Sequence, residues 1–132
     1  MYLIRVVYED GILQEAEVTN TLNGNPYFHA QTKNTGSEYQ FYKEGKHKFS
    51  LTDPITFSTI LLFFEEPLGI KTAYSEESGE YFPVEEKGEF TYRKRSGRSK
   101  TLFFYENQQL ERATIDAGII KFDLVKKTWK TR

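Results

Sequence analysis

Short runs in which apolar and polar residues alternate cover most of the chain, and this period of two is typical of β-strands. The clearest pair is residues 2–8 (YLIRVVY) and residues 12–18 (ILQEAEV), which flank an Asp-Gly sequence. Asp-Gly between two such runs predicts a β-hairpin. The chain is therefore expected to begin with two paired antiparallel strands.

Two loop lengths fit this first hairpin. A two-residue turn would set Ile4 opposite Glu17, an apolar side chain against a charge. A three-residue loop with Gly11 left-handed opposes apolar residues along one face and sets Arg5 against Glu15 on the other. We therefore predict the three-residue loop.

The same alternation recurs between clusters of turn-forming residues. A three-residue loop at residues 43–45 would close one further hairpin. Strands at this close spacing predict a mainly β fold, arranged as an antiparallel meander, a sandwich or a small barrel. The further predicted strands are residues 27–32, 37–43, 47–51, 89–95, 100–106 and 119–130.

Two segments have mixed patterns and are the candidates for one or two short helices. Residues 54–64 place apolar side chains at helical spacing, but their content of Ile, Thr and Phe favours a pleated strand. We prefer a buried strand that ends at Pro67. Residues 107–116 fit either a short helix or a strand.

Length, composition and net charge limit the kinds of protein that this chain can be. The length of 132 residues suits one β-rich domain, residues 1–132, and the 16% aromatic content supplies enough apolar area for an ordered core. Cysteine is absent, which excludes disulfides, thiolate metal sites and thiol nucleophiles. The net charge of −1 gives no overall field that would attract nucleic acid or membrane.

The charges are nevertheless segregated along the chain. Glutamates gather between Glu76 and Glu89, and a basic hairpin tip flanked by Tyr92 and Phe103 follows at once. Every plausible register of this hairpin opposes at least one pair of like charges, which destabilises the ladder. The residues of this basic tip are Arg93, Lys94, Arg95, Arg98 and Lys100.

The source of the balancing negative charge decides what the basic tip does. Nucleic-acid phosphates would fill this role, with Tyr92 and Phe103 stacking on unpaired bases if their rings face outward. An acidic protein partner would serve as well. The nearest source is the chain itself, because the run from Glu76 to Glu89 can fold back beside the tip. Alternatively, the tip is a solubilising turn whose charged edges discourage strand addition. We favour these structural explanations, with internal neutralisation first.

A second lysine-rich tip widens the candidate binding surface. Residues 38–48 (EYQFYKEGKHK) resemble residues 89–100 (EFTYRKRSGRSK) with one residue inserted. Internal duplication and chance similarity between two amphipathic hairpins are both open explanations. The basic residues of the second tip are Lys43, Lys46 and Lys48.

The sequence contains no motif for catalysis, metal binding or cofactor binding. The only histidines, His29 and His47, lie on predicted strands and lack H-x-H or H-E-x-x-H spacing. No P-loop, dinucleotide fingerprint or nucleophile elbow is present. We therefore expect no catalytic residue, no metal and no cofactor.

The N-terminal stretch MYLIRVVYED lacks the basic start and long apolar core of a signal peptide. The longest apolar run, residues 60–64, is far shorter than the roughly 20 residues of a membrane helix. We expect a cytoplasmic protein with no membrane role. The preferred function is non-enzymatic binding of a protein partner, or of a second copy, through hairpin tips and edge strands. Nucleic-acid binding through the basic tips is the alternative, and a small β-barrel that holds an apolar ligand is a third.

Overall fold

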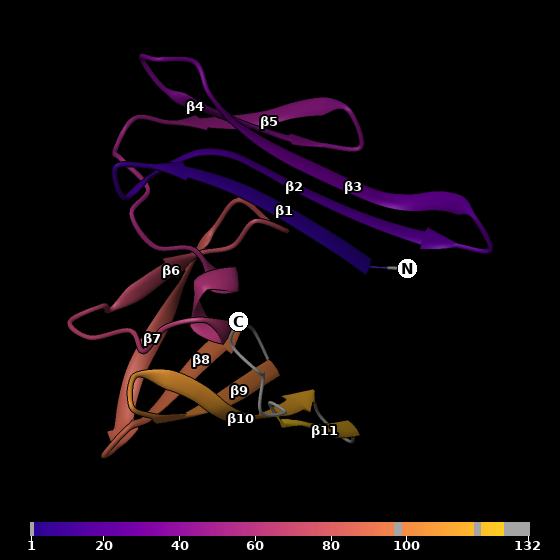
Figure 1. The fold of residues 1–132 in the computed structure, drawn as a ribbon. Coiled ribbons are helices and arrows are strands. Elements are labelled where there is room, and N and C mark those ends of the chain that lie inside the picture. The colour runs from indigo at the N-terminus through magenta and orange to yellow at the C-terminus, as the bar shows by residue number, and fades with distance from the viewer. Residues whose placement is uncertain (1, 97–98, 118–119, 126–132) are drawn as a thin grey trace, which may run out of the picture. The chain divides into compact units, whose positions relative to one another are not determined.

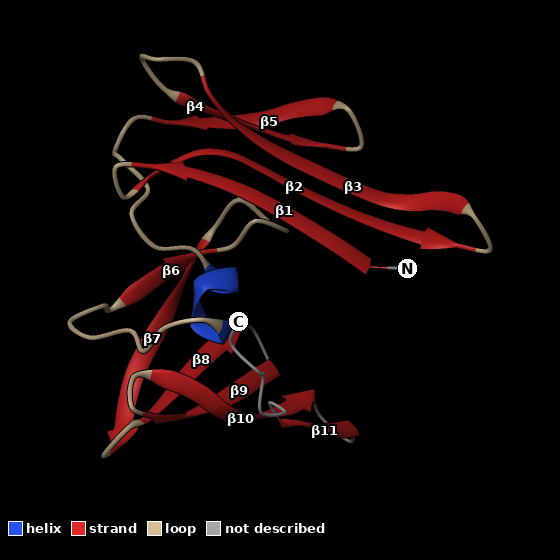
Figure 2. Cartoon of the chain, in the orientation of Figure 1, coloured by secondary structure: helices blue, strands red, loops and turns tan. Residues whose placement is uncertain are grey.

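The computed structural model describes residues 2–96, 99–117 and 120–125. Over these residues the chain is mainly β, which confirms the predicted fold class (Figures 1 and 2). In this described part no helix is long and apolar enough to cross a membrane. The elements are β1 Tyr2–Glu9, β2 Ile12–Leu22, β3 Asn25–Asn34, β4 Tyr39–Lys43, β5 Lys46–Leu51, the 3₁₀ helix η1 Thr59–Phe63, β6 Thr72–Tyr74, β7 Tyr81–Gly88, β8 Thr91–Ser96, β9 Ser99–Glu106, β10 Gln109–Ala117 and β11 Ile120–Val125.

The strands form two sheets in which neighbours in sequence are neighbours in space. The first sheet has the order β1-β2-β3-β4-β5 and the second has the order β11-β10-β9-β8-β7-β6. The ladders from β1 to β5 and from β7 to β11 are antiparallel, as a meander requires. Both orders are linear, so the described sheets are open and the small-barrel alternative is wrong.

The chain divides into two compact units. Unit 1 comprises Met1–Ile60 with Tyr74–Tyr81, and unit 2 comprises Leu61–Ala73 with Phe82–Arg132. The first sheet belongs to unit 1, and most of the second sheet belongs to unit 2. The single-domain organisation expected from the length stays a prediction.

The first hairpin closes with a two-residue turn, so the predicted three-residue loop is wrong. Asp10 and Gly11 both have left-handed backbone conformations, with φ of 53° and 76°. After two pairs the register shifts by one residue, and a β-bulge at Gln14 restores apolar opposition. Val6 then faces Ala16, and the other face carries an ion pair of 2.9 Å between Arg5 and Glu15.

The same construction recurs in three further hairpins. Each has two left-handed turn residues, two regular pairs and then a shift of one residue, with the extra residue on the second strand. The predicted loop at residues 43–45 is therefore wrong in length by one residue, because Lys43 already pairs with Lys46. The turns are Asn23-Gly24, Glu44-Gly45 and Asn107-Gln108.

The core of unit 1 lies on the inner face of the first sheet. One cluster contains Leu13, Ala16 and Tyr39, covered by Ile55 and Tyr74 from outside the five strands. The Tyr39 hydroxyl donates to the Leu13 carbonyl at 2.8 Å and accepts from the Ile55 amide at 3.2 Å. These bonds satisfy polar groups that burial would otherwise leave unpaired.

The segment expected as a buried strand up to Pro67 is instead an irregular stretch followed by the 3₁₀ helix η1. Within it only Ser58 forms a β-bridge, with Tyr74. The reason for the helical turn lies outside the segment. The buried carboxylate of Glu76 accepts hydrogen bonds from the Thr59 hydroxyl and the Ile60 amide, which caps the start of the helix.

The second helix candidate, residues 107–116, is strand rather than helix. It begins at the Asn107-Gln108 turn and continues as β10, which pairs with β9 on one side and β11 on the other. The ladder partners on both sides explain this outcome, because a central strand satisfies its backbone groups without helical bonds.

Candidate functional site

The basic tip lies at one end of the second sheet, at the β8–β9 turn. Ser96 pairs with Ser99 and Arg95 pairs with Lys100, so two like charges oppose each other across the ladder. Arg98 lies outside the described residues. The expectation of a like-charge pair in this hairpin is therefore confirmed.

A single carboxylate compensates much of this charge. Glu85 on β7 accepts a hydrogen bond of 3.0 Å from Arg93 and lies 3.9 Å from the Arg95 guanidinium. The hydrogen bond from Arg93 lowers the pKa of Glu85 below its ordinary value. Part of the favoured internal neutralisation is thus present, supplied by one member of the glutamate run.

The aromatic residues that flank the basic tip are not available to stack on bases. Tyr92 is 5% exposed and Phe103 is 1% exposed. The Tyr92 hydroxyl donates to Glu66 at 2.6 Å, and Phe103 packs edge-on against Phe63. Stacking on bases would require outward-facing rings, but Tyr92 and Phe103 are core residues of unit 2.

The second lysine-rich tip lies at the β4–β5 turn in unit 1. Lys43 pairs with Lys46, and the Lys43 ammonium lies 5.5 Å from the centre of the Phe28 ring, a cation–π contact. Lys48 is the extra residue of the bulge on β5. The ladder between β8 and β9 has no such bulge, so the two hairpins of the internal echo differ in construction.

The opposite end of the second sheet carries a different kind of surface. The β7–β8 turn places Phe90 at a φ of 60° with 51% of its surface exposed. A bulky residue at positive φ is a genuine outlier, because its Cβ crowds the backbone. The carbonyl of Phe90 accepts a hydrogen bond of 2.9 Å from the Tyr105 amide, which holds the turn in place.

The loop that follows η1 is anchored at the same end of the second sheet. The Glu66 amide donates to the Gln108 carbonyl of the β9–β10 turn at 3.2 Å, and the Glu66 carboxylate accepts from Tyr92. Because the strands alternate in direction, the β7–β8 and β9–β10 turns lie at one end of the sheet (Figure 1). Phe64 and Leu68, two residues before and after Glu66, are 70% and 60% exposed.

We call this end of unit 2 the apolar end and define it by Phe64, Leu68 and Phe90. Exposed carboxylates accompany it on the same turns and loop, namely those of Glu65, Glu89 and Glu106. Burial is the main cause that raises the pKa of Tyr105 above its ordinary value, and the negative charges of Glu66 and Glu65 add to it. The apolar end is therefore acidic, whereas the other end of the sheet is basic.

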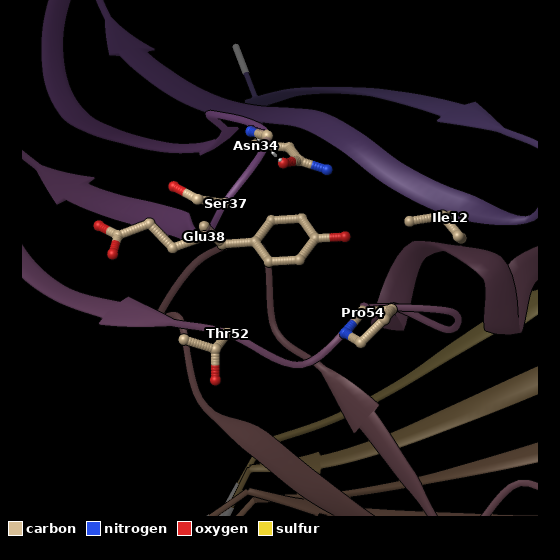
Figure 3. A pocket seen from close by; sticks show the side chains of 8 residues that line it. Ile12, Asn34, Ser37, Glu38, Thr52 and Pro54 are labelled. Carbon is tan, nitrogen blue, oxygen red and sulfur yellow. Dashed lines mark hydrogen bonds between the residues drawn. The ribbon is translucent and has the colours of Figure 1, made fainter.

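A pocket of about 180 Å³ lies in unit 1 beside the β3–β4 loop (Figure 3). Ile12 and Pro54 line one side of the pocket. Tyr39 also lines it. The Asn34 side chain already accepts a hydrogen bond of 2.8 Å from the Gly36 amide, and the Tyr39 hydroxyl has two partners. A volume of about 300–1,000 Å³ is usual for a small-molecule site, so this pocket is smaller than such sites.

Both histidines lie on strands of the first sheet, as the sequence indicated. His29 Nε2 is 2.9 Å from a carboxylate oxygen of Glu17, and its hydrogen bond lowers the pKa of that carboxyl group. His47 Nε2 is 3.1 Å from the hydroxyl of Ser50. Within the described residues, no three His, Asp or Glu side chains converge in a way that would hold a metal ion.

Sequence reasoning located the basic tips but missed the apolar end. The available signal was the sequence Gly88-Glu89-Phe90-Thr91 between two strands, a tight turn in which neither central residue is Gly, Asn or Asp. No curated protein and no solved structure matches the chain. A family described as a domain of unknown function (DUF6134) matches residues 2–127. The chain, with its two open meander sheets, therefore belongs to the DUF6134 family.

Proposed function

We propose that this chain is a non-enzymatic interaction module that binds a protein partner through the apolar end of unit 2. The observation that carries the proposal is Phe90, an aromatic residue in a left-handed turn position with half of its surface in water. Strained positions of this kind cluster at functional sites.

The energetics of Phe90 support a role outside the fold. A non-glycine residue in the left-handed region costs roughly 1–2 kcal/mol. A half-exposed ring recovers only part of the 1.5–3 kcal/mol or so that full burial of a phenylalanine provides. Glycine or asparagine would make the same turn with less strain. The side chain is thus better explained by contacts with a partner than by stability.

The chemistry of the apolar end supports one class of partner. Phe64, Leu68 and Phe90 offer large apolar surfaces, of the kind that anchor protein interfaces. Glu65 and Glu89 add negative charge at the rim. Carboxylates at the rim repel an anionic membrane surface and favour a partner that combines Lys or Arg with apolar side chains. The binding partner is therefore proposed to be a basic, apolar segment of another protein.

The test separates stability from binding at one position. Phe90→Asn keeps a residue that tolerates the left-handed turn but removes the ring. Selection from a random peptide library should enrich peptides in which Lys or Arg alternates with Leu, Phe or Trp. Their dissociation constants should rise by about tenfold or more with Phe90→Asn. The free energy of unfolding should stay equal or increase, because the turn is relieved of strain.

Leu3→Asn is the control, because Leu3 is a 53% exposed apolar residue of unit 1. It should leave peptide binding unchanged. Equal binding by wild type and Phe90→Asn would contradict the proposal. Salt-dependent retention on DNA that is lost when Arg93, Arg95 and Arg98 become Ala would instead assign the function to the basic tip.

A further inference from the structure

The first sheet has two edges that differ in chemistry. β5 forms one edge, and its residues from Lys46 to Ser50 are all exposed, with two lysines among the first three positions. Exposed lysines on a short edge strand discourage pairing with another chain. β1 forms the other edge, with eight residues and only two charged side chains.

β1 has the features of a strand that can accept a partner. In the described structure its ladder partner is β2, which leaves its outer row of backbone groups without a strand beside it. Its side chains alternate strictly in exposure, and Leu3 and Val7 on the outward face are 53% and 37% exposed. Most of its residues are β-branched or aromatic, which favours extended pairing.

We infer that β1 pairs with β1 of a second copy of this chain, antiparallel, with the two Val7 residues directly opposite at the two-fold axis. Side-chain charges select this register. Centring on Arg5 would oppose two arginines, and centring on Val6 would set Leu3 against Glu9. Centring on Val7 opposes Arg5 to Glu9 of the other copy twice, by symmetry.

The same register matches the inner face. Val6 of one copy lies opposite Tyr8 of the other, so apolar side chains meet on the face that carries the core of unit 1. A two-fold axis perpendicular to the sheet keeps the inner faces of both copies on one side. The product is a continuous ten-stranded sheet made of the two five-stranded sheets. This pairing is independent of the proposed binding at the apolar end.

Opposite charges at position 7 provide the test. In Val7→Lys and in Val7→Glu, two like charges would meet at the axis, so each variant alone should sediment as a monomer at concentrations where the wild type is a dimer. An equimolar mixture of the two variants should form a heterodimer, because Lys then meets Glu. Sedimentation velocity over a range of concentrations measures all three samples.

Leu3→Lys is the matched control on the same strand and face. In the register centred on Val7, Leu3 falls beyond the paired segment, so this variant should dimerise like the wild type. A monomeric wild type, a mixture that stays monomeric, or dissociation by Leu3→Lys would each overturn the inference. Circular dichroism of each variant identifies loss of folding, and the mixed sample keeps the test valid because an unfolded variant cannot form the heterodimer.

Discussion

A buried glutamate shows how far neighbours in sequence diverge in role. Glu76 is 1% exposed and caps η1 through the Thr59 hydroxyl and the Ile60 amide. Glu85, from the same acidic run, is instead an exposed partner of Arg93. Charge counting along the sequence cannot separate these roles, because each depends on which distant backbone or side chain lies opposite.

Replacement of Glu76 should destabilise the fold through the groups left behind. Glu76→Ala leaves the partly buried Thr59 hydroxyl and Ile60 amide without their acceptor, and an unsatisfied buried group costs about 1–3 kcal/mol. The expected loss in the free energy of unfolding is about 2 kcal/mol or more, measured by chemical denaturation. Glu76→Gln retains one carbonyl acceptor and should lose less. Equal stability of Glu76→Ala and wild type would show that the cap contributes nothing.

At the scale of secondary-structure elements, four hairpins share the same construction. Each combines a left-handed two-residue turn with a bulge after the second pair. In the first hairpin the bulge accompanies two bonds made outside the ladder. The Leu13 amide donates to the Ile55 carbonyl at 2.8 Å, and the Leu13 carbonyl accepts from Tyr39. The bulge therefore coincides with the anchoring of the loop at Ile55 onto the sheet.

Two single-residue deletions in β2 should have opposite outcomes. Deletion of Gln14 removes the bulge but keeps Val7 opposite Glu15 and every later pair, so unit 1 should still fold. The free energy of unfolding should fall by about 1–3 kcal/mol, because the hydrogen bonds that Leu13 makes outside the ladder are displaced. Deletion of Glu17 turns Val18 to the outer face and should prevent folding of unit 1.

Amide hydrogen exchange measured by NMR distinguishes the two deletions. Protection along β2 and β3 should survive deletion of Gln14 and disappear with deletion of Glu17. If deletion of Gln14 also abolished protection, the bulge would be required for folding rather than for anchoring.

The sequence predicted the strands more accurately than their registers. Residues 2–8 and 12–18 alternate clearly, and both are strands. The predicted register was wrong because a bulge shifts the pairing by one residue and leaves no mark in the composition of the strand, as at Gln14. The apolar end was missed for a similar reason. The loop around Glu66 is held at that end of the sheet by Tyr92 and Gln108, residues distant in sequence that no local pattern connects to it.

At the scale of the whole molecule, both units rely on buried tyrosine hydroxyls. In unit 1, the Tyr74 hydroxyl bonds to Thr32 at 2.8 Å, and burial raises its pKa to about 12. In unit 2, burial raises the pKa of both Tyr92 and Tyr105 above the ordinary value. Tyr74 belongs to the core cluster of unit 1, and the rings of Tyr92 and Tyr105 contact each other in unit 2. Each unit is therefore expected to be sensitive to alkali.

Stability should fall in alkaline solution for this reason. A tyrosine whose pKa is raised in the folded state contributes stability that is complete below its unfolded pKa of about 10. That stability is lost as the pH rises from about 10 towards the folded value of about 12 for Tyr74. The part of the tyrosinate absorbance that comes from the buried tyrosines should thus rise together with the loss of circular dichroism. Full tyrosinate absorbance in a still folded protein would contradict this expectation.

Tyr74→Phe provides the matched variant. Its loss of the bond to Thr32 should lower the free energy of unfolding at neutral pH by about 1 kcal/mol. Above pH 10, the free energy of unfolding of Tyr74→Phe should fall less steeply than that of the wild type. The variant lacks one hydroxyl group whose pKa is raised in the folded state. A decline as steep as that of the wild type would show that Tyr74 does not titrate with unfolding.

The sheets also bear on how the chain is made. Each strand lies beside the strand that precedes it, from β1 to β5 and again from β6 to β11. During synthesis on a ribosome, every strand after the first of its sheet therefore emerges when its partner is already available. Short connections also make the chain entropy lost on pairing small. We expect each sheet to grow by one strand at a time in the order of translation, so that few unpaired edges are exposed to neighbouring nascent chains.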